Sequence, residues 1–166
     1  QVWITLARWH LQHDDLAAAA DAAAHLRTLA ADDAETALIS FEVGLARGDL
    51  MAADQAIEAG LAAHPDDERM HLARGLVGIR RGRPEEAVAT LRAGLALHPR
   101  SSPLLATLAE LLLERGDLAA ARDTIDALIA AVGRESPVVT LLEGWYLVER
   151  RTWLGAKRAL EGLRPL

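Results

Sequence analysis

Two groups of side chains have types and spacing that could do chemistry. His10 and His13 lie one helical turn apart and are followed directly by Asp14 and Asp15, so the four residues resemble a metal-binding cluster. Pairs of neighbouring carboxylates, which could act in general acid–base catalysis, occur at residues 32–33, 66–67 and 85–86.

Both groups have a simpler structural explanation. The surrounding register places His10 at a helix-packing position, and Asp14 and Asp15 in a turn between two helices. The carboxylate pairs fall at expected helix N-termini, where the helix dipole stabilises negative charge. The sequence contains no Gly-x-x-x-x-Gly-Lys-Ser/Thr loop and no Gly-x-Ser-x-Gly motif. We therefore expect no catalytic residue, no metal and no cofactor, in a protein that is not an enzyme.

A third group consists of arginines at the expected ends of helices, namely Arg47, Arg81, Arg115 and Arg150. Such a row could bind an acidic partner. Alternatively, a cation near a helix C-terminus gains about 0.3–1 kcal/mol from the exposed carbonyl groups. We favour the second explanation.

The composition predicts an all-α fold. Of 166 residues, 51% are apolar and only 4% aromatic, and Ala, Leu, Arg and Glu favour helices. The net charge of −6 disfavours binding to nucleic acid or anionic lipid, and no apolar run is long enough to cross a membrane. The absence of cysteine excludes disulfides and thiolate chemistry.

The chain begins with Gln1 rather than Met, so we expect it to be a piece of a longer protein. Its bias toward Arg and Ala favours a bacterial origin. Any targeting segment is expected outside the chain, which is compatible with a cytoplasmic or a periplasmic location.

Several features recur every 34 residues, which predicts a repeat protein. Gly48-Asp49-Leu50 returns 68 residues later as Gly116-Asp117-Leu118, with Gly82 midway between them. A His-Pro pair at 64–65 returns at 98–99. Small and larger apolar residues keep the same spacing, at Ala53, Ala87 and Ala121, at Ile57, Leu91 and Ile125, and at Gly60 and Gly94.

Each unit is expected to contain two helices. In the second unit they are predicted over residues 35–47 and 51–63. Gly48 ends the first helix because glycine tolerates a left-handed backbone. Asp49 caps the second helix, and Pro65 stops it. The small residues of each unit fall where neighbouring helices must approach closely.

This pattern resembles the tetratricopeptide repeat family over essentially the whole chain. The units beginning at Ala34 and Glu68 match best, whereas the unit from Ser102 has Gly133 in place of the closing proline, and the last unit is shifted by one residue. The resemblance implies one all-α domain, a right-handed α-solenoid of about five helical hairpins. The expected repeats are about 1–33, 34–67, 68–101, 102–135 and 136–166.

The resemblance also implies a binding surface. In the family the first helices of the units line a concave groove that holds a protein or peptide segment. The matching positions form an apolar strip with charges of both signs at its margins, at Arg8, Leu11, Leu38, Glu42, Leu45, Arg69, Leu72, Leu76, Ile79, Arg80, Glu110, Leu113, Glu114 and Trp145. An exposed strip of this kind is typical of a partner-binding surface. We therefore expect a protein–protein interaction scaffold.

Other interpretations fit the same residues. The strip could pack on further repeats or on a parent domain. The chain could be a regulatory or interaction module of a larger enzyme or of an envelope-assembly protein. RNA binding of the pentatricopeptide type is disfavoured, because that family has 35 residues per unit and the net charge here is −6. Uncapped ends, with Trp3 and Trp9 on the first helix, predict weak self-association.

Overall fold

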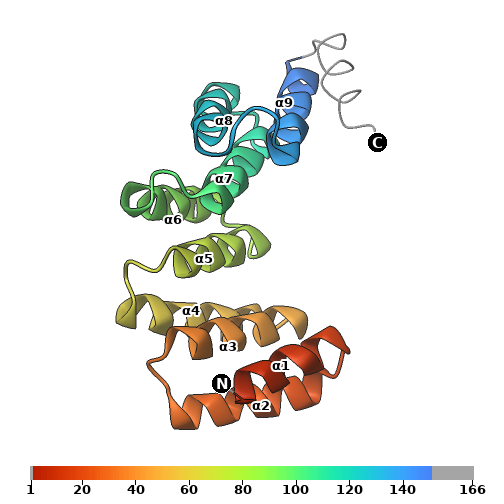
Figure 1. The fold of residues 1–166 in the computed structure, drawn as a ribbon, viewed down its shortest axis with the longest axis vertical. Helices are drawn as coiled ribbons and strands as arrows, with labels where there is room; N and C mark the ends of the chain where they lie inside the picture. The colour runs from red at the N-terminus through yellow and green to blue at the C-terminus, as the bar shows by residue number, and fades with distance from the viewer. Residues whose placement is uncertain (1, 151–166) are drawn as a thin grey trace. The chain divides into compact units, whose positions relative to one another are not determined.

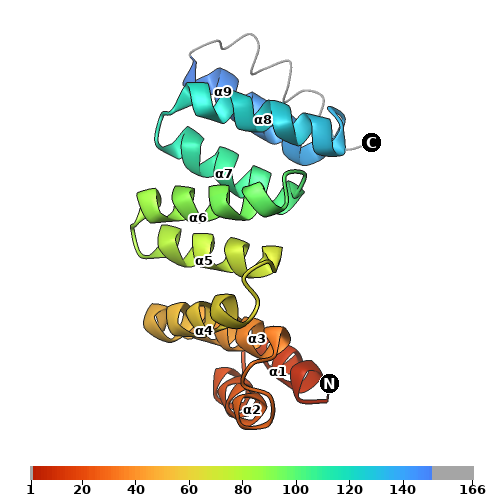
Figure 2. The same ribbon diagram turned by 90° about the vertical axis from the view of Figure 1, so that its left-hand side faces the viewer.

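The computed structural model describes residues 2–150, which form α-helices joined by short turns and contain no strand. Within each unit, Figures 1 and 2 show successive helices packed as antiparallel pairs, α1 with α2, α3 with α4, and α7 with α8. Their bounds are α1 Val2–Gln12, α2 Leu16–Leu29, α3 Ala34–Ala46, α4 Leu50–Ala63, α5 Glu68–Arg80, α6 Pro84–Leu97, α7 Ser102–Glu114, α8 Leu118–Val132 and α9 Pro137–Glu149. The second helix of the last expected hairpin lies outside the described residues.

The predicted turn between the two helices of a unit is confirmed. Gly48, Gly82 and Gly116 adopt the left-handed backbone, with φ of 73°, 68° and 73°. Asp49 caps α4 by accepting a hydrogen bond from the Ala52 amide at 3.0 Å, and the helix bounds differ from expectation by one residue.

The first hairpin makes the same turn without glycine. Asp14 stands one period before Gly48 and takes a left-handed φ of 58°. A side chain in this region crowds the backbone, although aspartate tolerates it better than most residues. The turn geometry is therefore kept where the preferred residue type is missing.

The chain divides into two compact units, Gln1–Arg83 and Pro84–Leu166. The first unit holds two apolar clusters. One lies between α1, α2 and α3 around Ala19 and Ile39, and the other joins α3, α4 and α5 around Ile57 and Met70. Every one of these four side chains is fully buried.

Close helix approach in unit 1 depends on small residues. A Cβ atom added to Gly60 would lie 2.8 Å from both the Ala37 Cβ and the Met70 Sδ. A Cβ on Gly44 would lie 2.8 Å from the backbone nitrogen of Ala53. The predicted contact role of Gly60 is thus confirmed, and Gly44 adds a second contact that the period alone did not identify.

In the described part of unit 2, α7 packs between α6 and α8 and also contacts α9. Leucines supply most of its core, and Leu104, Leu112 and Leu128 are fully buried. No helix within residues 2–150 combines the length and the apolar character that a bilayer crossing requires.

We expect Asp14→Gly to stabilise the protein by about 0.5–1 kcal/mol, because it relieves the left-handed strain and removes a negative charge from the end of α1. Thermal or urea unfolding monitored by circular dichroism measures this change. Gly48→Asp is the matched reverse substitution and should destabilise. If Asp14→Gly and Gly48→Asp changed the free energy of unfolding equally and in the same direction, the turn assignment would be contradicted.

We expect Gly44→Ala to destabilise the protein by about 1–3 kcal/mol, because the added methyl group meets the Ala53 backbone, which cannot move aside cheaply. Helix propensity alone predicts the opposite sign. Urea unfolding decides between the two, and a stabilised variant would show that the helices separate at no cost.

Candidate functional site

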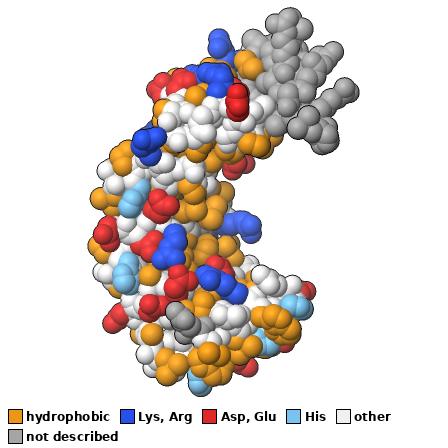
Figure 3. Space-filling view, viewed as in Figure 1, with side chains coloured by type: hydrophobic (Ala, Val, Ile, Leu, Met, Phe, Trp, Pro, Cys, Tyr) orange, Lys and Arg blue, Asp and Glu red, His pale blue; other side chains and the backbone are white. Residues whose placement is uncertain are grey.

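Charged side chains from three successive first helices meet on one face of unit 1. Arg8 of α1 donates through Nη2 to Glu35 Oε2 of α3 at 2.9 Å, and its Nε lies 4.0 Å from Glu42 Oε2. Arg69 of α5 pairs with the same Glu35 and with Asp67, the latter at 2.7 Å. Figure 3 shows basic and acidic side chains gathered together on this unit. We call the surface that carries Arg8, Glu35, Glu42 and Arg69 the first-helix face.

Three of these residues, Arg8, Glu42 and Arg69, are among those expected in the partner groove, and Glu35 is not. A signal for Glu35 was present in the sequence, since Glu35 and Arg69 stand 34 residues apart and carry opposite charges. Arg8 and Glu42 have the same relation. Opposite charges at one position of successive units therefore indicate side chains that meet across the first helices.

Burial and hydrogen bonding shift the pKa values of three side chains at this face. Burial raises the pKa of the Glu42 carboxyl above its usual value, although the charge of Arg8 opposes this. The hydrogen bond from the Arg69 side chain lowers the pKa of Asp67. Hydrogen bonds to Asp67 and Glu35 raise the pKa of Arg69, so Arg69 remains a cation. The Glu42 carboxyl is 4.0 Å from Arg8 Nε, and its side chain keeps 40% of its surface exposed.

The apolar residues expected in the groove divide into two groups. Leu38 is only 8% exposed and belongs to the core cluster of α3, α4 and α5, so the expectation that it lies at the surface is wrong. It packs there because α5 covers the side of α3 from which Leu38 projects. The others in unit 1 are half-buried, namely Leu11, Leu45, Leu72, Leu76 and Ile79, whereas Arg80 is exposed.

The remaining expected residues lie on α7 and α9 of unit 2, two helices that contact one another. Leu113 is 2% exposed and is part of the interior, which corrects its expected exposure. Glu110 and Glu114 are exposed, and burial together with the charge of Glu114 raises the pKa of Glu110. Trp145 is half-buried, and its Nε1 donates to Glu149 Oε1 at 3.2 Å.

The recurring arginines are the C-terminal caps of their helices, as predicted, at Arg47, Arg81, Arg115 and Arg150. The structure adds partners that the sequence did not indicate. Arg81 pairs with Asp54 of α4, Arg115 pairs with Glu85 of α6 at 2.8 Å, and Arg150 lies over the Tyr146 ring. Within residues 2–150, Arg47 has no such partner.

The remaining chemistry-bearing residues of the sequence have structural roles. Asp33 and Asp67 cap α3 and α5, which confirms their place at helix N-termini. His10 Nδ1 lies 3.3 Å from Asp15 Oδ2, and the His13 ring stacks on exposed Trp9 with centroids 4.1 Å apart. Over residues 2–150, no three His, Cys, Asp or Glu side chains come together in a metal-binding arrangement.

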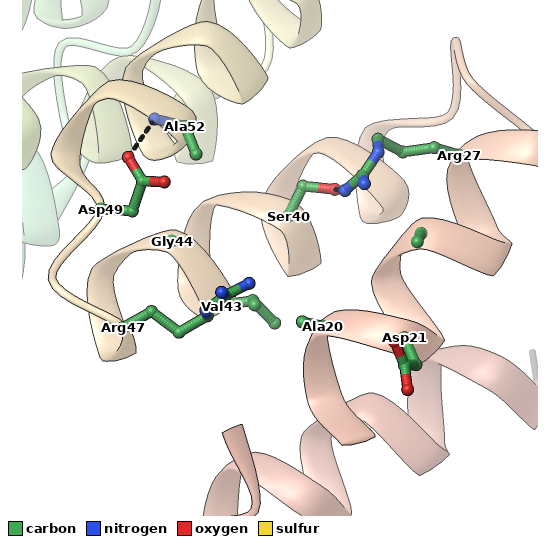
Figure 4. A pocket seen from close by; sticks show the side chains of 10 residues that line it. Ala20, Asp21, Arg27, Ser40, Val43, Gly44, Arg47, Asp49 and Ala52 are labelled. Atoms are coloured by element: carbon green, nitrogen blue, oxygen red, sulfur yellow. Dashed lines mark hydrogen bonds between the residues drawn. The ribbon is translucent and has the colours of Figure 1, made fainter. Parts of the chain in front are cut away.

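A pocket of about 290 Å³ lies between α2, α3 and α4, and no pattern in the sequence indicated it. Figure 4 shows the side chains that line it, among them Arg27, Ser40 and Arg47. The pocket lies on the opposite side of α3 from the first-helix face, because Ser40 and Glu42 are separated by about half a helical turn.

Solved structures similar to this chain show its fold. A structure titled as a functional characterization of Pseudomonas aeruginosa pilF matches with a TM-score of 0.82 at 20% identity, over 97% of this chain and 73% of that chain. A MamA structure matches with a TM-score of 0.76 at 12% identity, over 97% of this chain and 87% of that chain. The fold is accordingly an all-α helical repeat solenoid.

A third structure is of a thermophilic tetratricopeptide repeat protein from Thermus thermophilus, with a TM-score of 0.71 at 22% identity, over 94% of this chain and 80% of that chain. No curated protein matches the chain. Two family models do, both described as tetratricopeptide repeat, at residues 45–102 and 79–143. Because these matches together extend over more than half of the chain and agree with the 34-residue period, the chain belongs to the tetratricopeptide repeat family.

Proposed function

We propose that this protein binds a peptide or protein segment on the first-helix face of unit 1. The family consists of protein-interaction repeats that are typically not catalytic. The observation that carries the proposal is the set of ion pairs joining Arg8, Glu35 and Arg69, because it aligns charged side chains from α1, α3 and α5 over one surface. A segment that lies across these helices would meet all of them.

Half-buried apolar side chains accompany these charges. Leu45 and Leu76 pack against the core cluster and still keep part of their surface accessible. Leu72 and Ile79 are also half-buried, and neither belongs to that cluster. Covering such surface with the apolar anchors of a partner is favourable by about 25 cal/mol per Å². The bound segment is therefore expected to carry apolar residues at helical or extended spacing.

The charges favour a segment that carries both signs. Exposed Arg80 has no ion-pair partner within residues 2–150, so it is available to an acidic residue. Glu42 has 40% of its side-chain surface exposed, so it is accessible to a basic residue or an amide donor. In unit 2, exposed Glu110 and Glu114 would favour basic residues in the same way.

The test uses peptides selected on this chain from a random display library. Leu72→Glu should weaken the binding of the selected peptides by about tenfold or more, because it places a charge among the apolar anchors. Fluorescence polarisation with labelled peptides measures the affinity, and circular dichroism verifies that the variant is folded.

Met51→Glu is the matched control, since Met51 is 66% exposed on α4, a second helix. It makes an equivalent apolar-to-acidic change away from the first-helix face and should leave the affinity unchanged. If the two variants weaken binding equally, or if Leu72→Glu binds as the parent does, the proposed surface is incorrect.

A further inference from the structure

Successive repeats are joined by equivalent pairs of helices, so the residues at one position of these pairs can be compared. The second helix of one hairpin packs on the first helix of the next in the pairs α2 with α3, α4 with α5, α6 with α7, and α8 with α9. At one register position of these pairs the residues are Ala20 with Ser40, Asp54 with Arg74, Val88 with Leu108, and Arg122 with Glu143. In the last pair, Glu143 stands one residue later than the 34-residue period predicts, because the final repeat is shifted by one residue.

Where both residues at this position are charged, a carboxylate is bound by arginine. Between α4 and α5, Asp54 accepts from Arg74 Nη1 at 2.7 Å and also pairs with Arg81. Between α8 and α9 the charges are exchanged, and Arg122 Nη1 lies 3.4 Å from Glu143 Oε1. The helix geometry therefore suits a carboxylate–guanidinium pair at this position.

Between α2 and α3 both residues are small, and a pocket takes the place of the ion pair. Ala20 has no carboxylate to offer, and Ser40 is too short to fill the space. An adjoining cavity of about 450 Å³ is lined by Ala20 and Arg47 as well. The pocket is thus the site that corresponds to the Asp54 carboxylate one repeat later.

The cationic groups of this pocket have free hydrogen-bonding capacity. Arg47 stands at the position of Arg81, and within residues 2–150 it has no partner. Arg27 donates from Nη1 to Ser40 Oγ at 3.4 Å, and Figure 4 shows the two side chains pointing toward one another. Neither arginine is paired with a carboxylate in this part of the chain.

Two acids also line the pocket, and their positions bear on its chemistry. The Asp49 carboxylate is engaged as the cap of α4, where it accepts from the Ala52 amide at 3.0 Å. Asp21 is exposed on α2, and its side chain points away from Ser40 in Figure 4. Among the described residues it forms no ion pair with Arg27 or Arg47. The lining thus offers two guanidinium groups and a hydroxyl group to an incoming acceptor.

We propose that this pocket binds a carboxylate group supplied by a ligand, in the role that Asp54 has within the chain. Arg47 would bind the carboxylate as Arg81 binds Asp54, with Arg27 and Ser40 as further donors. The carboxylate can belong to an acidic side chain of a protein partner or to a free organic acid. The site lies on the other side of α3 from the first-helix face and is independent of the function proposed for that face.

Titration of the ¹⁵N-labelled 166-residue chain, followed by the backbone amide signals of Gly44 and Arg47, tests the proposal. The probes are glutarate, neutral glutaramide, inorganic phosphate, and two end-blocked peptides that differ by one Glu-to-Gln exchange. We expect saturable shifts with glutarate or with the Glu peptide, and none with glutaramide or the Gln peptide. Tighter binding of the peptide assigns the carboxylate to a protein, and tighter binding of glutarate assigns it to a free acid.

Arg47→Gln should weaken this binding by about tenfold or more, since it removes a charged donor. Arg115→Gln is the matched control, because this substitution changes the net charge by the same amount. Arg115 caps α7 at the equivalent position and is already paired with Glu85. Ala20→Asp should abolish binding by supplying the carboxylate from within the chain. Equal losses in both arginine variants, unchanged binding in Ala20→Asp, or tighter binding of phosphate than of either carboxylate would overturn the proposal.

Discussion

The closest contacts of the first unit are the constraint on which its surfaces depend. Gly44 leaves no room for a methyl group against the Ala53 backbone, and Gly60 leaves none against Ala37 and Met70. These contacts fix how α3, α4 and α5 pack. Because helices are rigid at this length, fixing their contacts also fixes which side chains can meet at the surface. The pairing of Glu35 with Arg69 across α3 and α5 follows from that packing.

One backbone geometry supports different chemistry in successive repeats. The register position that holds Asp54 between two arginines holds Arg122 with Glu143 in the last described pair of helices. Where the residue is Ala20, it leaves a pocket beside Arg47. A repeat fold can vary such positions because the small-residue contacts, and not the ion pairs, carry the close packing. Partly exposed ion pairs contribute only about 0–1 kcal/mol each, so their exchange or loss is tolerated.

The two sides of α3 therefore differ in character. One side carries Glu35 and Glu42 toward α1 and α5, and the other carries Ser40 and Arg47 toward α2. Each side combines residues from neighbouring hairpins, so neither surface exists in a single repeat. A stack of simple hairpins can thereby present chemically distinct surfaces without any insertion.

The sequence by itself determined the helical class, the 34-residue unit, the Gly48-type turns, the contact role of Gly60 and the place of Arg8, Glu42 and Arg69 on the first helices. Periodicity reports the unit, the turns and the small-residue contacts because most repeats share them. Only the tertiary structure decided that Leu38 and Leu113 are buried, that Arg81 pairs with Asp54, and that the space beside Ala20 is open. These properties differ from one repeat to the next, since each depends on the particular side chain that the neighbouring helix brings within a few ångströms.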